Sequence, residues 1–128
     1  MAVVGLGLDI CSIERLRRIL EGPRAQRFLD RVYTDAERAL CAGRADAASA
    51  FAARFAAKEA LVKALGAPPG IRWRDMEVVR QGGAPGFALS GVAARVMAER
   101  RLGALLSLTH DAGVAAATVV LQDLPERS

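Results

Sequence analysis

The stretch FAARFAAKEALVKAL, residues 51–65, decides the fold, because it forms most of the longest helix that the sequence supports. Asp46 is a typical helix N-cap, and the glycine-proline loop at residues 66–70 stops the helix, so we predict a helix from Asp46 to Leu65. At about 100° per residue, Lys58 falls within the apolar stripe and Glu59 on its edge. Charged groups in such places are usually paired or line a cleft, because an unpaired buried charge is costly.

Lysine is used very selectively in this chain. Sixteen of the eighteen basic residues are arginine, and the two lysines, Lys58 and Lys63, lie on either side of Glu59. A compact ammonium serves a phosphate differently from a planar guanidinium, so the pattern indicates a phosphate site. The alternative is an ordinary pair between Glu59 and Lys63, four residues apart on a solvated helix face.

The N-terminal segment GLGLDI, residues 5–10, alternates as a half-buried strand does. Asp9 shares one face of this strand with Gly5 and Gly7. Glycines leave that face without side chains, so a ligand could approach the backbone beside a carboxylate. The alternative is that the glycines mark a bulge or a close contact between strands.

Helix caps, helix-breaking glycines and prolines, and the alternation of apolar and polar residues predict the remaining elements. Ser12 caps a short helix that ends at Gly22, and a capping box from Thr34 to Glu37 opens another. Further helices are expected at 24–32 and 92–101, strands at 76–80 and 86–89, a hairpin from 105–109 and 114–121, and a frayed tail at 122–128. The fold class is therefore α+β, with one small antiparallel sheet packed by one long helix and several short helices.

Length and composition indicate one domain, residues 1–128, with 52% hydrophobic and 25% charged residues. The longest apolar run, residues 113–121, is too short for a membrane span, which needs about 20 residues. The N-terminus lacks a basic leader, and Cys11 and Cys41 lack metal or disulfide spacing. We therefore expect a cytoplasmic protein without a membrane partner.

The residues that can carry chemistry are few: Asp9 on the glycine-cleared strand, Glu59 between two lysines, and His110 at the mouth of the hairpin. The sequence has no Walker loop, no Gly-x-Ser-x-Gly motif and no zinc ligand cluster. Two carboxylates beside lysines suit Mg²⁺, which takes one or two protein carboxylates and completes its shell with water and phosphate oxygen. The pattern favours a phosphoryl-type transfer.

Several segments resemble the holo-(acyl carrier protein) synthase family of 4′-phosphopantetheinyl transferases, nearly collinearly over the whole chain. They are GLGLDI (5–10), IER (13–15), RVYTDAE (31–37), RFAAKEALVKA (54–64), LSG (89–91) and SLTHD (107–111). One departure is Ala84, where the family often has a basic residue before the proline. The resemblance implies transfer of 4′-phosphopantetheine from coenzyme A to a serine of apo-acyl carrier protein, with release of adenosine 3′,5′-bisphosphate.

The resemblance also implies roles for individual residues. Asp9 and Glu59 would hold Mg²⁺ on the pyrophosphate of coenzyme A, and Lys63 would reach a phosphate oxygen during catalysis. Arg54 and Lys58 would serve the pyrophosphate and the 3′-phosphate. His110 would lie against the nucleotide, unless it is only a structural hydrogen bonder, and the loop that begins at Gly66 would border the adenine.

A cluster of arginines between residues 15 and 31 predicts an acidic helical partner, which the resemblance identifies as acyl carrier protein. We expect Arg15, Arg24 and Arg27 to bind it. The alternatives are a non-catalytic carrier-protein binder, a small basic module that binds nucleic acid, and a solvated surface without a partner. Aromatic residues, at 5%, are too few for a base-stacking platform, so we expect no nucleic-acid partner.

We also predict a homotrimer with sites between subunits, which the resemblance implies. Coenzyme A is long relative to any cleft that such a small domain can form. The apolar hairpin, with Val114, Val119, Val120 and Leu121, is the surface expected to be covered by neighbours.

Overall fold

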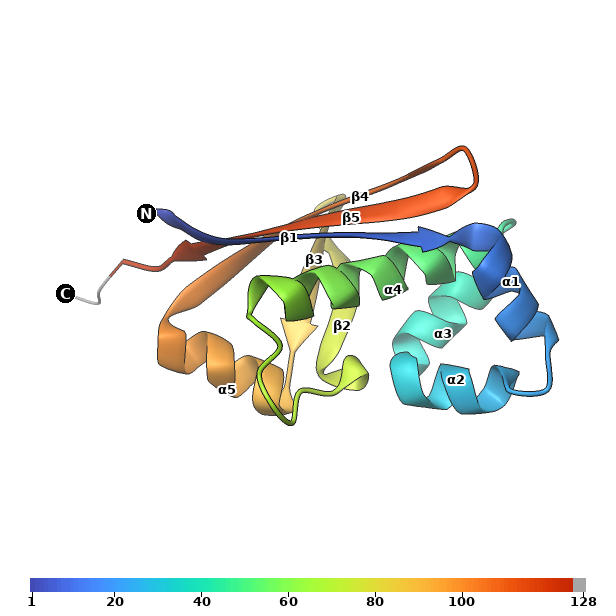
Figure 1. Ribbon diagram of the computed structural model, residues 1–128, viewed down its shortest axis with the longest axis horizontal. Coiled ribbons are helices and arrows are strands. Elements are labelled where there is room, and N and C mark those ends of the chain that lie inside the picture. Colours follow the sequence, from blue (N-terminus) through green and yellow to red (C-terminus); the bar gives the residue numbers. More distant parts are fainter. Residues whose placement is uncertain (126–128) are drawn as a thin grey trace.

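The computed structural model describes residues 1–125 and has the α+β architecture that the sequence predicts (Figure 1). Its largest sheet has three antiparallel strands in the order β1-β5-β4, and the elements are β1 (Val3–Ser12), β4 (Leu102–Asp111) and β5 (Val114–Asp123). The predicted frayed tail is wrong at its start, because Gln122 pairs with Val3 and Gly103 within the sheet. The end of that tail, 126–128, lies outside the described residues.

The expectation of one sheet is also wrong, because β2 (Met76–Gln81) and β3 (Ala84–Leu89) form a separate two-stranded hairpin. Both edges of β5 are already occupied by β1 and β4. The hairpin instead lies in the layer beneath the larger sheet, beside α4, and buries Met76 and Val78 in the core (Figure 1). It therefore adds a layer to the fold rather than a strand to the sheet.

The long helix α4 (Ala47–Ala64) lies along the larger sheet, and its predicted bounds and cap are confirmed. The Asp46 carboxylate accepts a hydrogen bond from the backbone N–H of Ser49 at 3.2 Å. The buried face of α4 is rich in alanine, whose small side chain allows close packing: Ala52, Ala53, Ala56, Ala57 and Ala60.

The glycines of β1 face α4, not a ligand. A Cβ on Gly7 would lie 1.9 Å from the carbonyl oxygen of Ala60, and a Cβ on Gly5 would lie 3.2 Å from that of Ala64. The strand and the helix therefore meet backbone to backbone, and a side chain at Gly7 would separate them. Of the two alternatives, close packing is correct, although the neighbour is a helix and not a strand.

The remaining helices flank α4. α1 (Ile13–Glu21), α2 (Ala25–Val32) and α3 (Asp35–Ala42) gather near the start of α4, while α5 (Gly91–Arg100) follows β3 near the opposite end (Figure 1). The Ser12 cap of α1 and the Thr34–Glu37 capping box of α3 are both confirmed. The short 3₁₀ helix η1 (Trp73–Asp75) leads into β2.

The outer face of the larger sheet is apolar and uncovered. Its exposed side chains are Val4, Leu6, Leu8 and Ile10 of β1 and Leu105 of β4. Val119 and Leu121 were expected to be covered by neighbouring subunits, but they are buried within the chain, because they point toward α4. No helix in the described part of the chain is long and apolar enough to cross a membrane.

Candidate functional site

Asp9 and Lys63 meet where β1 runs beside the last turns of α4 (Figure 1). The Lys63 ammonium donates to the Asp9 carboxylate at 2.6 Å and lies 3.4 Å from the backbone oxygen of Leu8. The second carboxylate oxygen of Asp9, Oδ2, is buried and accepts no hydrogen bond from the described residues. Because such an oxygen is costly to bury alone, it is suited to a cation or a donor from a ligand.

Glu59 lies one helical turn before Lys63, on the same side of α4. Burial raises the pKa of the Glu59 carboxyl, and the neighbouring negative charge of Asp9 raises it further. The hydrogen bond from Lys63 to Asp9 raises the pKa of the Lys63 ammonium, so that lysine remains charged. Two carboxylates are thus held close together, with Lys63 beside them and the positive charge of Arg15 also acting on Glu59.

These residues fit Mg²⁺. The described residues contain no group of three or more histidine, cysteine, aspartate or glutamate side chains that could enclose a metal ion. Mg²⁺ is commonly held by only one or two carboxylates, with phosphate and water oxygens in its remaining positions. Asp9, with its unpartnered Oδ2, and the neighbouring Glu59 are the two carboxylate ligands that an open site of this kind needs.

A small cavity of about 260 Å³ opens beside Glu59. It is lined by apolar side chains that include Phe28 and Phe55, with Arg15 at its wall. Cys11 also lines it, but burial raises the pKa of the Cys11 thiol to about 11, so the thiol stays protonated at neutral pH. The cavity can therefore admit a hydroxyl or an apolar chain to Glu59 without a competing thiolate.

The prediction that Lys58 contacts coenzyme A is wrong. Its side chain is fully buried, and the ammonium donates to the Glu37 carboxylate at 2.6 Å, to the Val32 carbonyl at 2.7 Å and to the Trp73 carbonyl at 3.0 Å. Its three N–H groups are thus fully used inside the protein. Its place in the apolar stripe allowed Lys58 either to be paired or to line a cleft, and the structure shows that it is paired.

Arg54 and His110 are brought together in a separate pocket of about 550 Å³. Arg54 is 4% exposed; one of its terminal nitrogens donates to the Ala50 carbonyl at 3.3 Å, while its buried Nε has no partner among the described residues. Arg44 and Arg80 also line this pocket and were missed, because nothing in their local sequence distinguishes them from other surface arginines. The arrangement is suited to an anion.

The predicted carrier-protein residues lie on two neighbouring surfaces. Arg24 and Arg27 line a groove of about 610 Å³ together with Arg18 and Arg31, whereas Arg15 lines the smaller cavity beside Glu59. Two apolar side chains, Ile19 and Phe28, line both. The arginine groove and the cavity beside Glu59 are therefore neighbours. Gly66 lies apart from both, in the exposed loop after α4, with a φ of 76° that favours glycine.

Comparisons with known proteins show which proteins this chain is similar to. Residues 5–118 match the family model described as the 4′-phosphopantetheinyl transferase superfamily. The chain is 78% identical over 122 residues to the holo-(acyl-carrier-protein) synthase of Myxococcus xanthus, covering 95% of this chain and 97% of that protein. It is 57% identical to the enzyme of the same name from Anaeromyxobacter dehalogenans strain 2CP-1, over 94% of this chain and 96% of that one.

Two solved structures are also similar. One is the Helicobacter pylori holo-(acyl-carrier-protein) synthase in complex with coenzyme A, with a TM-score of 0.78 and 31% identity over 91% of this chain and 99% of that one. The other is the holo-ACP-synthase of Plasmodium yoelii, with a TM-score of 0.82 and 26% identity over 97% of this chain and 98% of that one.

Proposed function

The chain belongs to the 4′-phosphopantetheinyl transferase superfamily and transfers 4′-phosphopantetheine from coenzyme A to apo-acyl carrier protein, and we propose that Asp9, Glu59 and Lys63 carry out this transfer. The observation that supports this assignment most is the buried Oδ2 of Asp9, which lacks a partner beside a second carboxylate and a lysine. Asp9 and Glu59 would hold Mg²⁺, which when bound neutralises charge on the pyrophosphate.

The chain's own side chains do the remaining work at the reacting centre. The serine oxygen of the carrier protein bonds to the β-phosphorus as the bond from that phosphorus to the bridging oxygen breaks, and adenosine 3′,5′-bisphosphate leaves. Lys63 is 57% exposed, so its ammonium can turn from Asp9 toward a phosphate oxygen and stabilise the charge that develops there. Glu59, which lines the cavity beside the reacting centre, is the carboxylate placed to take the serine proton.

The 3′-phosphate of coenzyme A would lie in the pocket that holds Arg54 and His110. The buried Arg54 Nε has no partner among the described residues, which supports this part of the proposal. Gly66 would border the adenine, as the family resemblance implies. Lys58 has no place in this scheme, because its donors are already used.

The acyl carrier protein would dock on the arginine groove through acidic side chains, by charge complementarity with Arg24 and Arg27. Arg15, at the wall of the inner cavity, would meet the segment that carries the serine. Ile19 and Phe28 line both the groove and the cavity, so a partner docked in the groove would lie next to the cavity that Glu59 lines.

We further propose that the working form is a homotrimer, with active sites shared between subunits. The uncovered apolar face of β1, with Leu6, Leu8 and Ile10 each at least 60% exposed, supports burial against a second copy of the chain. A cytoplasmic location is part of the same proposal, and the free thiols of Cys11 and Cys41 are compatible with it.

Mass spectrometry tests the proposed roles directly. Apo-carrier proteins of fatty acid and polyketide synthesis are incubated with coenzyme A, Mg²⁺ and the wild-type chain, and gain one phosphopantetheinyl group. Asp9→Asn and Glu59→Gln should each lower the rate by orders of magnitude, about 10²-fold or more, because charge in the transition state is left uncompensated. Glu99→Gln, which neutralises an exposed carboxylate on α5, is the matched control. Near wild-type rates in both folded site variants would exclude the metal assignment.

A further inference from the structure

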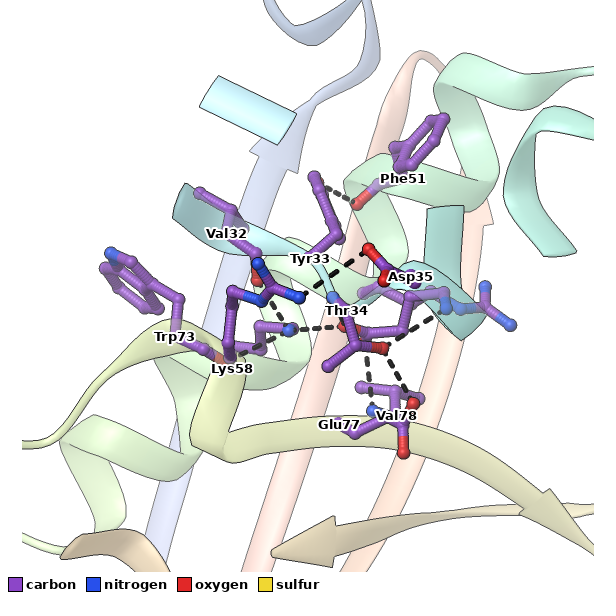
Figure 2. A network of polar contacts seen from close by, with 12 residues as sticks. Val32, Tyr33, Thr34, Asp35, Phe51, Lys58, Trp73, Glu77 and Val78 are labelled. Carbon is purple, nitrogen blue, oxygen red and sulfur yellow. Dashed lines mark hydrogen bonds and ion pairs between the residues drawn. The ribbon is translucent and has the colours of Figure 1, made fainter. Parts of the chain in front are cut away.

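Lys58 lies fully buried where several segments of the chain meet (Figure 2). Its ammonium bonds to the carbonyl of Val32, the last residue of α2, to the carbonyl of Trp73 in η1, and to Glu37 of α3. Figure 2 shows Lys58 between Val32 and Trp73. Since Lys58 itself belongs to α4, one side chain ties three elements to the long helix.

The acceptor side of this network is equally complete. Glu37 also accepts hydrogen bonds from the backbone N–H groups of Thr34 and Val78, both at 2.9 Å. The Thr34 hydroxyl donates to Glu77 at 2.7 Å, which extends the network along β2 (Figure 2). Three acceptors around one nitrogen suit a tetrahedral ammonium better than a planar guanidinium. This geometry explains why lysine stands at position 58 in a chain that otherwise favours arginine.

One element that this network holds in place is α2. Val32 is its one buried residue, and its N-cap, Arg24, makes no side-chain capping bond. Phe28 adds edge contacts to Tyr33 and Phe55, and Asp30 and Gln26 bond to the partly exposed Arg38 at the surface. The buried end of α2 is therefore held by the bond from Lys58 to the Val32 carbonyl, together with the buried side chains of Val32 and of its C-cap, Tyr33, whose hydroxyl donates to the Phe51 carbonyl at 2.7 Å.

The groups that hold the reacting centre are different. Asp9, Glu59 and Lys63 are positioned by the backbone contact between Gly7 of β1 and Ala60 of α4, which involves neither α2 nor η1. Glu59 follows Lys58 directly, so the two side chains leave α4 about 100° apart and reach different surfaces. Loss of the Lys58 network would thus loosen α2 and leave the carboxylates in place.

We propose that Lys58 is a positioning residue for the carrier protein: it holds α2, with Arg27, Arg31 and Phe28, against α4, and so sets the shape of the arginine groove. This inference rests on the proposed docking of the carrier protein in that groove. The two lysines of α4 then have different roles: Lys63 acts at the phosphate, and Lys58 acts through α2 on the binding of the carrier protein.

The test is steady-state kinetics of Lys58→Met, with Lys58→Met/Glu37→Leu as a second variant that leaves no lone buried charge. Both should raise the KM for apo-carrier protein about tenfold and leave the dissociation constant of coenzyme A within about twofold. Emission of the single tryptophan, Trp73, should shift to longer wavelength, because its carbonyl loses the bond that fixes η1. Met97→Ala, a core truncation in α5, is the control for lost stability and should leave this KM unchanged.

The outcomes separate this inference from the docking proposal on which it rests. Arg24→Glu/Arg27→Glu should raise the same KM; if it does and the Lys58 variants do not, Lys58 does not position the groove. If the Lys58 variants raise the KM while the arginine reversals do not, the effect does not run through α2, and the inference is also overturned. Weakened coenzyme A binding in both Lys58 variants would place Lys58 at the donor site instead.

Discussion

Substitution of Gly7 by alanine should damage both stability and catalysis, because this glycine sets the distance between β1 and α4. The added Cβ would lie 1.9 Å from the carbonyl oxygen of Ala60, 2.8 Å from its carbonyl carbon and 3.1 Å from the backbone nitrogen of Ala64. All three atoms are backbone, so no side chain can rotate away. The strand must move by at least 1.1 Å to bring the shortest distance from 1.9 to 3.0 Å.

The size of the effect follows from that displacement. Overpacking of a rigid interior costs about 1–3 kcal/mol, and backbone neighbours place Gly7→Ala at the upper end of that range. For a chain of this size, about 3 kcal/mol corresponds to a melting temperature lower by about 10 °C. Asp9, two residues further along β1, moves with the strand, and a misplacement of about 1 Å at a reacting centre can cost about 10²-fold in rate.

Calorimetry and the transfer assay measure the two effects separately. Gly86→Ala is the matched control, because a Cβ there meets no atom within 4 Å, and its melting temperature should stay close to that of the wild type. Turnover of Gly7→Ala is measured well below its melting temperature, where the variant is folded. If Gly7→Ala had the same melting temperature as Gly86→Ala and kept wild-type turnover, this contact would not hold the strand in place.

Three further predictions concern the site and the assembly. Burial and Asp9 raise the folded-state pKa of Glu59 above its unfolded value, so the folded chain binds that proton more tightly and loses stability as the pH rises above about 4.5. With a chelator present, Glu59→Gln should therefore melt at a higher temperature than the wild type at pH 7 and at about the same temperature near pH 4. A lower melting temperature of the variant at pH 7 would contradict the reasoning. Lys63→Ala should impair coenzyme A binding and turnover. Lys63→Arg should restore them only partly, since a planar guanidinium does not replace a compact ammonium. Equal activity of Lys63→Arg and wild type would show that the lysine is dispensable. Light scattering of the wild type at micromolar concentration should give about three times the 13.5 kDa of the chain, and Leu8→Glu should lower that mass; a fully active wild-type monomer would refute the shared site.

Local signals in the sequence predicted the elements well. The caps at Ser12, Thr34 and Asp46 each involve residues within three positions of one another, and the structure contains all three. The C-terminal hairpin is predicted too short at its turn, because His110 and Asp111 look like turn residues. In the structure they pair with small or apolar residues of β5, and the turn is confined to 112–113.

Contacts between distant segments were harder to predict. The sequence placed Lys58 in an apolar stripe, but its partner, Glu37, lies 21 residues earlier and had a sufficient explanation in its capping box. No local pattern distinguishes a lysine that binds a ligand from one that binds a buried glutamate. Arg44 and Arg80 were missed for a related reason, since only the folding of the chain brings them to the pocket of Arg54.

The different burial of the two lysines also determines which of them a reagent that modifies amines can reach. Apart from the N-terminal amine, the chain has two primary amines, and that of Lys58 is completely enclosed. An acylating reagent therefore finds Lys63 as its one accessible lysine, directly beside Asp9. A chain with sixteen arginines thus has a single accessible lysine, and a label attached to Lys63 would report from the proposed reacting centre.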